Sequence, residues 1–574
     1  MTVSLPVARS NGARTIFLVS AFVTVAIMLW DHHLKIGGAI PGLTPIYFFL
    51  FTVLDYPAAI CALLILVCAV LIPDAIRPRS ILRAIGEHPV VVSGIAAALL
   101  CVGSLTVYQN HPLAMDEYAQ LFQSRIFAAG HLAGQFPAPL INWLIPEGFQ
   151  NYFLSVSPTT GRVASEYWPA FALLLTPFTW LGIPWACNPL ISGLTLIAIH
   201  RLALQLFADR ESAGLALLLT AASPVFFANG ISYYSMPAHL LANCVYALLL
   251  LAPTSRRAFA AGVVGSIALT LHNPVPHILF ALPWLVWVVR REHGLRLFCW
   301  LSAGYLPLCV LLGIGWFWFY GHLAHEGMSA AQSLSSSGLG RVGGAFAVPN
   351  STVLLARLIG LAKIWIWAVP GLVVLAAVGA WKWRADPKCR LLLVSALLTF
   401  LGFMFVPADQ GHGWGFRYFH SAWVALPILA AAALTHRPGF STNGIAASLE
   451  QGEALTFVVA CALLTLVVGV GFRAQQMHEF IAADLNQVPD YRGTEPRVVI
   501  LDTTEQFYGA DLVQNDPWVR GTIMRMVSRG KTEDAEMMRA AFPALHEVYD
   551  DRFGTVWSAA QPPTHSATDA ATLP

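Results

Sequence analysis

Apolar runs about as long as a bilayer is thick recur along most of this 574-residue chain. A helix needs about 20 apolar residues to cross the hydrocarbon core, where every backbone polar group must be paired inside the protein. Hydrophobic residues make up 57% of the sequence and charged residues 11%, whereas a soluble globular chain is about 25% charged. The sequence therefore predicts an all-α polytopic membrane protein.

The apolar runs predict about thirteen transmembrane helices. We expect them at residues 16–30, 46–72, 90–107, 186–207, 213–229, 239–251, 259–271, 278–289, 297–320, 368–381, 391–406, 423–434 and 455–470. A further amphipathic piece, residues 353–367, leads into the tenth. The apolar piece 168–182 contains prolines and is short for a span, so we expect a helix at the membrane surface.

Lys and Arg are concentrated in the short loops on one side of this alternation. Arg9 and Arg14 precede the first run, and Arg77, Arg79 and Arg83 follow the second. Cytoplasmic loops are rich in Lys and Arg, so the N-terminus is predicted to be cytoplasmic and the long loops and C-terminus extracytoplasmic. No small-residue cleavage site follows the first run, so we expect a retained first helix rather than a signal peptide.

The chain divides into a transmembrane domain, residues 1–472, and an extracytoplasmic tail, residues 473–574. Within the first domain, residues 108–186 form the first large outer loop. In the tail, a buried strand at 497–502 and a helix at 534–545 predict a small soluble α/β structure. The nine cysteines lie in or beside apolar runs or in a basic loop, which argues against a disulfide framework. No basic tract indicates nucleic acid.

An acidic pair, Asp116 and Glu117, stands in the outer loop directly after the third run. Apolar residues at helical spacing follow the pair, and Gly130 suits the end of that helix. Carboxylates at a helix start commonly cap free amides. A carboxylate held there can also act as a general base. The two roles are compatible, and the residues alone leave both open.

A second group lies between residues 411 and 420, just before a predicted span. Its glycines let the backbone bend close to a ligand. An arginine there can bind a phosphate through two hydrogen bonds, and the aromatic rings offer stacking faces. The alternative is an ordinary interfacial belt of aromatic residues. The side chains expected to bind substrate are His412, Trp414, Arg417, Tyr418 and His420.

Tyr234, His239 and His272 lie at the outer ends of other predicted spans. Such residues are more often polar helix ends than ligands, but they could line a shared outer cavity.

His322, His325 and Glu326 look like a metal site at first sight. Their order, H-x-x-H-E, matches neither the zincin nor the inverzincin arrangement. The sequence therefore predicts no metal ligands there.

Asp55 is the clear acidic residue inside a predicted span, and we expect it to be paired or to face an internal cavity. Arg357 and Lys363, on the amphipathic piece, are expected to meet lipid headgroups or to help hold an anionic lipid donor.

Three short motifs, in this order, resemble the GT-C class of polytopic glycosyltransferases, near the protein mannosyltransferases and lipid A aminoarabinose transferases. The first is the acidic pair with its helix. The second is Tyr167-Trp168-Pro169 with the apolar run to residue 182. The third is Gly413-Trp-Gly-Phe-Arg-Tyr418. The resemblance covers most of residues 15–472.

The resemblance implies inverting, hexosyl- or mannosyltransferase-like transfer of a sugar from a polyprenyl-phosphate donor to a glycan, lipid or protein acceptor. Asp116 would be the base, and Glu117 would orient it or bind sugar hydroxyls. Arg417 would hold the phosphate with His412 and His420. Many members place another acid in the second outer loop, where this chain has the segment 232–235 and a histidine. A divalent metal (Mg or Mn) is therefore left open.

Two other classes remain. A secondary transporter or flippase for a lipid-linked or anionic substrate would use polar groups near mid-membrane. A structural assembly factor would need no converging cavity. If Asp55 faced a central cavity and Asp116 faced bulk water, the structure would favour a transporter over a glycosyltransferase.

Overall fold

The computed structural model describes residues 11–71, 76–325, 347–435, 452–489, 495–504 and 506–559. The chain divides into two compact units, each assembled from separate stretches of sequence. We call them the membrane unit (Met1–Asn110, Ile183–Gly315 and Ser337–Met477) and the loop–tail unit (His111–Gly182, Trp316–Ser336 and His478–Pro574). The first outer loop and the C-terminal tail thus belong to the same compact unit.

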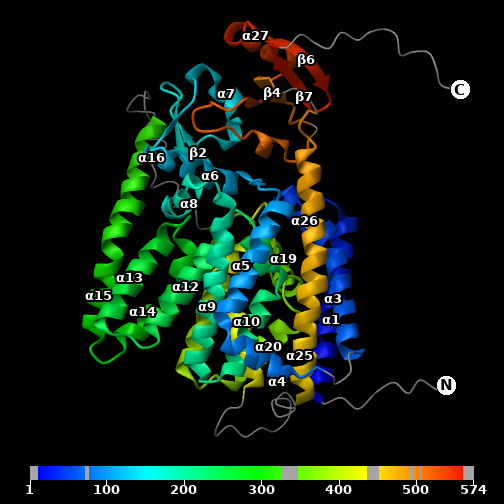
Figure 1. Ribbon diagram of the computed structural model, residues 1–574, viewed down its shortest axis with the longest axis vertical. Coiled ribbons are helices and arrows are strands. Elements are labelled where there is room, and N and C mark those ends of the chain that lie inside the picture. Colours follow the sequence, from blue (N-terminus) through cyan, green and yellow to red (C-terminus); the bar gives the residue numbers. More distant parts are fainter. Residues whose placement is uncertain are drawn as a thin grey trace, which may run out of the picture. The chain divides into compact units, whose positions relative to one another are not determined.

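The membrane unit consists of packed helices (Figure 1). Helix α9 packs against α5, α10 and α12, and α13 packs along α15. The helices are α1 (Asn11–Gly37), α2 (Pro45–Phe49), α3 (Tyr56–Leu71), α4 (Pro78–Glu87), α5 (Pro89–Thr106), α9 (Cys187–Phe207), α10 (Arg210–Ala221), α11 (Pro224–Gly230), α12 (Met236–Leu250), α13 (Ser255–Thr270), α14 (Val275–Val289), α15 (Gly294–Leu308), α19 (Ser351–Ile366), α20 (Leu372–Lys382), α21 (Pro387–Gly402), α22 (Arg417–His420), α23 (Ala425–Leu434), α25 (Gly452–Leu464) and α26 (Val470–Leu485).

Short helical turns of other types join several of these helices. The π-helical segments η1 (Leu50–Asp55), η5 (Cys309–Ile314) and η7 (Thr465–Gly469) continue neighbouring α-helices, and η4 (Pro184–Ala186) and η6 (Phe403–Phe405) are 3₁₀ turns.

Seven helical stretches among the described residues are long and apolar enough to cross a membrane, or eight if one bent pair is a single span. Several shorter apolar helices accompany them, including α12, α14, α20 and α23. The protein is therefore a multi-pass membrane protein, and the predicted total of thirteen spans is not confirmed. The seven stretches are Asn11–Gly37, Pro45–Leu71, Pro89–Thr106, Pro184–Phe207, Gly294–Leu323, Pro387–Phe405 and Gly452–Leu485.

The span predicted at 213–229 is not a single straight helix. Helices α10 and α11 are bent by 64° at a short break. Pro224 is the first residue of α11, and Ser223 before it has an extended backbone. Proline lacks the N–H donor that would continue the ladder of α10, so the chain starts a second helix there.

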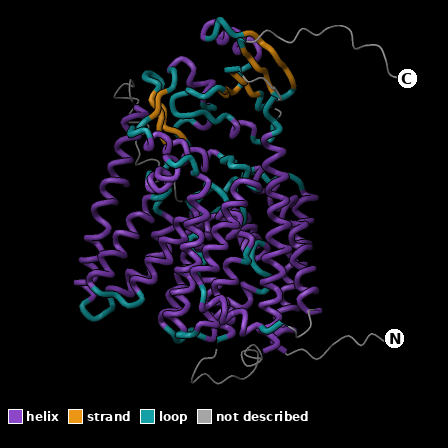
Figure 2. Tube along the Cα trace, viewed as in Figure 1, coloured by secondary structure: helices purple, strands orange, loops and turns teal. Residues whose placement is uncertain are grey.

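The loop–tail unit contains two small sheets, drawn in orange in Figure 2. The loop sheet has the order β1-β3-β2, with β3 antiparallel to both neighbours. The tail sheet has the order β5-β4-β7-β6; β4 and β5 are parallel, and the other two pairs are antiparallel. The strands are β1 (Gly134–Gln135), β2 (Leu154–Val156), β3 (Arg162–Ser165), β4 (Arg497–Leu501), β5 (Ile523–Val527), β6 (His546–Asp551) and β7 (Gly554–Ser558).

The helices of this unit come from the loop, the tail and a segment between them. They are α6 (Met115–Ala128), α7 (Ile141–Leu144), α8 (Ala170–Trp180), α16 (Gly315–His325) and α27 (Lys531–Ala541), with the 3₁₀ turns η2 (Ala138–Leu140), η3 (Glu147–Phe149) and η8 (Gly509–Leu512). The predicted tail strand and tail helix are confirmed as β4 and α27, and the predicted helix after the acidic pair is α6.

One hydrophobic core joins the first outer loop to the tail. Met115, Tyr118 and Phe122 of α6 are buried in the same cluster as Ile500 of β4 and Met526 of β5. Burial of this kind stabilises a structure by roughly 25 cal/mol per Å² of apolar surface. The helix that carries the acidic pair is therefore held by tail residues about 400 positions later in the sequence.

Candidate functional site

The two carboxylates of the acidic pair have different surroundings. Glu117 is fully buried, and its Oε2 accepts a hydrogen bond from the Leu113 N–H at 2.9 Å. Asp116 is half-buried in the first turn of α6. The first turn of a helix leaves backbone N–H groups without helical partners. Glu117 reaches back past this turn and caps the N–H of Leu113, which lies two residues before the helix begins. The capping role thus belongs to Glu117, and Asp116 is the more accessible carboxylate.

Asp116 accepts a hydrogen bond from the Tyr167 hydroxyl. Tyr167 follows β3 and donates its backbone N–H to Ser165 Oγ at 3.1 Å. The Ser165 N–H in turn donates to Gln123 Oε1 at 2.9 Å, on the same helix as the acidic pair. The loop sheet and α6 therefore fix the tyrosine, and the tyrosine fixes one carboxylate oxygen of Asp116.

Another carboxyl group, Asp511 in η8, accepts a hydrogen bond from the Met115 N–H at 2.8 Å. Burial, together with the charges of Asp484, Asp116 and Glu117, raises the pKa of Asp511 to about 8 against the lowering effect of that N–H. The start of α6 thus gathers several carboxyl groups.

His111, just before the acidic stretch, has the opposite response to the same environment. Burial lowers its pKa to about 4, and the positive charge of Arg525 adds to the shift. The imidazole of His111 is therefore neutral at neutral pH and adds no positive charge beside α6.

The glycine-rich segment of the membrane unit is a tight turn. Gly411, Gly413 and Gly415 have positive φ angles of 60°, 112° and 65°. Gln410 closes the turn, because its Nε2 donates to the carbonyl oxygens of Gly413 (3.3 Å) and Gly415 (2.9 Å). Asp409 accepts the Gly411 N–H at 2.7 Å. The predicted bending at glycine is confirmed.

Arg417 is buried within this turn. Its N–H donates to Gln410 Oε1 at 2.8 Å, and its guanidinium donates to the Gln410 carbonyl. The guanidinium carbon lies 4.4 Å from the centre of the Tyr234 ring. The structure therefore brings Arg417 and Tyr234 together as a cation over an aromatic face.

The aromatic residues of the turn are packed rather than exposed. Trp414 is buried and donates its ring N–H to the Tyr108 hydroxyl at 3.3 Å. The Tyr418 hydroxyl donates to the Asp409 carbonyl at 2.7 Å, and its ring stacks on Phe403 at 4.4 Å. His412 accepts the N–H of the next residue at its Nδ1, 2.9 Å away. These contacts shape the turn.

Three of the predicted histidines lie near one another in the membrane unit. His272 and His420 are within electrostatic range of His239, as is His277. His239 and His420 are both 1% exposed. Neither ring nitrogen of His239, nor Nδ1 of His420, has a hydrogen-bond partner among the described residues. Buried polar atoms are normally paired, so these nitrogens are suited to a polar ligand.

The predicted site residues divide between the two units. Asp116 and Glu117 belong to the loop–tail unit, and the other eight belong to the membrane unit. The described residues contain no group of three His, Cys, Asp or Glu side chains able to hold a metal ion. Glu326 lies outside the described residues, as does the side chain of His325, so the His322 cluster is not covered.

The expectation for Lys363 and Arg357 is wrong, because both side chains are 1% exposed. Lys363 Nζ lies 2.8 Å from Asp55 Oδ2, and Arg473 Nη2 lies 2.8 Å from Asp55 Oδ1. Trp367 also donates to Asp55 Oδ1, at 2.8 Å. Asp55 is thus paired, as expected. Arg357 donates to backbone carbonyls of residues 403, 406 and 408. The expectation failed because the face of α19 that carries these cations packs against other helices of the protein rather than against lipid.

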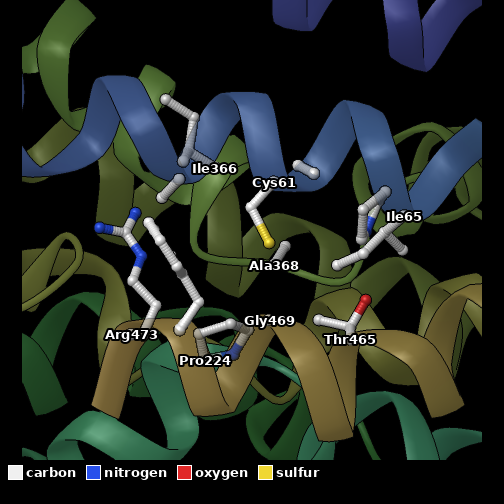
Figure 3. Close-up of a pocket in the computed structure, with 12 residues that line it drawn as sticks. Cys61, Ile65, Pro224, Ile366, Ala368, Thr465, Gly469 and Arg473 are labelled. Carbon is white, nitrogen blue, oxygen red and sulfur yellow. The ribbon is translucent and has the colours of Figure 1, made fainter. Parts of the chain in front are cut away.

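A narrow pocket opens beside this charge cluster (Figure 3). Cys61 and Ile65 of α3 face Thr465 and Gly469 of η7 across it, and Arg473 lies at one end. The remaining lining is mostly alanine, isoleucine, proline and phenylalanine. The pocket is therefore mostly apolar, with one guanidinium in its wall.

No family model and no curated protein sequence matches the chain. The fold is nevertheless a GT-C-like polytopic membrane fold. The solved structures that share it include ArnT from Cupriavidus metallidurans in the apo state, with a TM-score of 0.50, 14% identity, and coverage of 82% of this chain and 98% of ArnT. The structure of ArnT bound to undecaprenyl phosphate also covers 82% of this chain and 98% of ArnT, with 14% identity and a TM-score of 0.49. At this identity the likeness shows the fold alone.

Several residues that shape the site were not singled out by the sequence. Asp511 and Asn515 come from the tail, and Gln410 is an ordinary amide next to the glycine-rich turn. Tyr167 was noticed as part of a motif, but nothing in its spacing indicates that it binds Asp116. A tail carboxylate close to a loop 396 residues earlier leaves no local signal.

Proposed function

We propose that the protein is an inverting glycosyltransferase that moves a sugar from a polyprenyl-phosphate donor to an acceptor on the extracytoplasmic face of a bacterial inner membrane. The N-terminus would be cytoplasmic, and the loop–tail unit, with Asp116, extracytoplasmic. The observation that carries the proposal is the half-buried Asp116 at the start of α6, held by Tyr167, in a chain with a GT-C-like fold.

In this reaction the acceptor oxygen attacks the anomeric carbon while the bond from that carbon to the donor phosphate breaks. The bonding electrons leave with the phosphate, so no strong acid is needed for the leaving group. Asp116 takes the proton of the acceptor hydroxyl. Tyr167 holds one oxygen of Asp116, which leaves the carboxylate oriented for that transfer. Glu117 acts through the local backbone, because its Oε2 accepts the Leu113 N–H.

Arg417 is the proposed phosphate-binding group of the membrane unit. A departing phosphate is stabilised by a preorganised positive charge more than by one that must be brought in from water. The guanidinium is fixed over Tyr234 and by Gln410, and this gives it a defined position. His239 and His420 have buried ring nitrogens without a hydrogen-bond partner among the described residues, and we propose that they bind polar groups of the substrate. Trp414, Tyr418 and His412 shape the turn that carries Arg417.

The donor class is supported by the fold that the chain shares with ArnT, a protein that binds undecaprenyl phosphate. The acceptor stays open between lipid, glycan and protein. Mg or Mn takes no part in the proposed reaction, because Asp116 belongs to no group of three His, Cys, Asp or Glu side chains among the described residues that could hold a metal ion.

A secondary transporter or flippase is the other candidate. Its best residue was Asp55, but both oxygens of this carboxylate are engaged, by Lys363 on one side and by Arg473 and Trp367 on the other. A proton- or ion-coupling acid must exchange its partner during transport, whereas this network is that of a structural ion pair. The glycosyltransferase is therefore the better supported function.

The experiment is a transfer assay with purified protein in nanodiscs, a panel of radiolabelled polyprenyl-phosphate sugars, and membrane extract as acceptor. Wild type should move label to an acceptor, whereas Asp116→Asn should move far less. Asp550→Asn, which changes a carboxylate on the exposed strand β6, is the control and should behave like wild type. A flipping assay with a fluorescent polyprenyl-phosphate runs in parallel. Flipping without any transfer, from every donor of the panel, would replace the proposed enzyme with a transporter.

A further inference from the structure

The start of α6 is held from the C-terminal tail. The Met115 N–H donates to Asp511 Oδ1 at 2.8 Å, and Gln514 Nε2 donates to the Pro112 carbonyl at 2.7 Å. Met115 is the first residue of the helix, where an N–H has no helical partner. Ala114 at the N-cap has no side-chain acceptor, and the partner of the Met115 N–H comes from a residue 396 positions away.

A second contact fixes the same helix one turn later. The Tyr118 hydroxyl donates to the Asn515 carbonyl and accepts the Asn515 N–H at 2.9 Å. The Asn515 side chain is in turn bound to the backbone of Arg525 in β5, donating at 2.8 Å and accepting at 2.9 Å. The tail segment is thus anchored to its own sheet before it contacts α6.

These two contacts bracket Asp116. Met115 precedes it and Tyr118 follows it by two residues, so a shift at either contact moves the backbone that carries its carboxylate. Both residues are also buried in the common core, at 1% and 2% exposed. The tail therefore sets the position of the helix start, while Tyr167 sets the orientation of the side chain.

We propose that the tail segment Asp511–Asn515 is a positioning element for the acidic helix start, with Asp511 as the positioning residue that places Asp116 against the acceptor. The inference rests on the proposed function for its catalytic consequence. It assigns the C-terminal tail a part in the reaction through the backbone of α6, without contact between Asp511 and the substrate.

The test compares Asp511→Ala, which removes the acceptor of the Met115 N–H, with Asp511→Asn, which keeps an oxygen in the same place. The matched control is Asp534→Ala. Asp534 is a similarly buried tail carboxylate that binds Trp143, Ser528 and the Arg529 N–H rather than α6. Tyr118→Phe removes the second contact and serves if Asp511→Ala does not fold.

Two readouts are needed, namely sugar transfer and hydrogen–deuterium exchange of the amides at residues 113–118. A misplacement of about 1 Å can reduce a rate by on the order of 100-fold. Asp511→Ala should lower kcat about 10- to 100-fold with the donor KM within about threefold, and should speed amide exchange at 113–118. Asp511→Asn should restore both values, and Asp534→Ala should change neither.

The outcomes separate the two proposals. Wild-type exchange at residues 113–118 in both Asp511→Ala and Tyr118→Phe would overturn the positioning element, whether or not the protein transfers sugar. Faster exchange with unchanged kcat would also overturn it. Absence of transfer by the wild type would overturn the proposed function, while the exchange data would still report whether the tail holds α6.

Discussion

Substitution of Gly413 by alanine should weaken donor binding by displacing Arg417, whereas the same change at Gly411 should not. A Cβ at Gly413 would lie 2.4 Å from Arg417 Cδ and 2.6 Å from its Nε. At Gly411 a Cβ would have no atom within 4 Å. Both residues have a positive φ, so the pair separates the effect on Arg417 from backbone strain.

The size of each effect follows from the geometry. At Gly411, with φ of 60°, an alanine costs about 1–2 kcal/mol of folding free energy. At Gly413, with φ of 112°, the strain is on the order of 1–3 kcal/mol, and the side chain of Arg417 must move in addition. Loss of a hydrogen bond to a charged group costs about 1.5–3 kcal/mol. We therefore expect donor affinity to fall about 10- to 100-fold.

The assay is equilibrium binding of undecaprenyl phosphate to wild type, Gly413→Ala and Gly411→Ala in nanodiscs, with thermal melting of each protein as the control for folding. Gly411→Ala should bind like wild type in spite of a lower melting temperature. Equal dissociation constants for all three proteins would refute the assignment of Arg417 to the phosphate.

Three further predictions concern stability and protonation. Glu117→Gln keeps an acceptor for the Leu113 N–H and should melt like wild type, whereas Glu117→Ala should lose about 1–3 kcal/mol; equal melting of both would contradict the capping role. Asp55→Asn leaves two buried cations without an anion and should lose about 3–5 kcal/mol, while Lys363→Met leaves Asp55 with its second cation and should lose less; the reverse order in thermal melts would refute the ion-pair account. Asp511 has a pKa of about 8 in the folded state and of about 3.9 in the unfolded state. Between these values the folded state holds a proton that the unfolded state releases, so protonation of Asp511 stabilises the fold at low pH. This contribution to the free energy of unfolding falls by about 2 kcal/mol from pH 6.5 to 8. Asp511→Asn should lack this decline in denaturant titrations at the two pH values, and an identical decline in the variant would show that Asp511 is not its source.

The features that depend on local pattern could be predicted from the sequence. The length of the apolar runs predicted the membrane class, a short continuous apolar run predicted the buried strand β4, and helical spacing of apolar residues predicted α6. The glycine-rich segment bends at three glycines, as its composition indicates. Each of these depends on residues within a few positions of one another, and the physical causes are backbone hydrogen bonding in lipid, side-chain periodicity and the freedom of glycine.

The features that depend on residues distant in the sequence could not be predicted. An amphipathic pattern places Lys363 on one face of α19, but whether that face meets lipid or an acid depends on Asp55, 308 positions away. The bond from Met115 to Asp511 spans 396 positions. The break at Pro224 was within reach of local reasoning, since proline at a helix start ends the preceding ladder. Its apolar surroundings gave the appearance of a single span.

The central claim, that Asp116 is the base of a sugar transfer, is tested most directly by single turnover. Protein saturated with a radiolabelled polyprenyl-phosphate sugar is mixed with excess acceptor, and wild type is compared with Asp116→Asn. The account predicts unchanged donor affinity and a transfer rate reduced by at least about 100-fold, since general-base catalysis typically contributes 10²–10⁴-fold. A rate close to that of wild type in Asp116→Asn, with donor bound equally well, would contradict it.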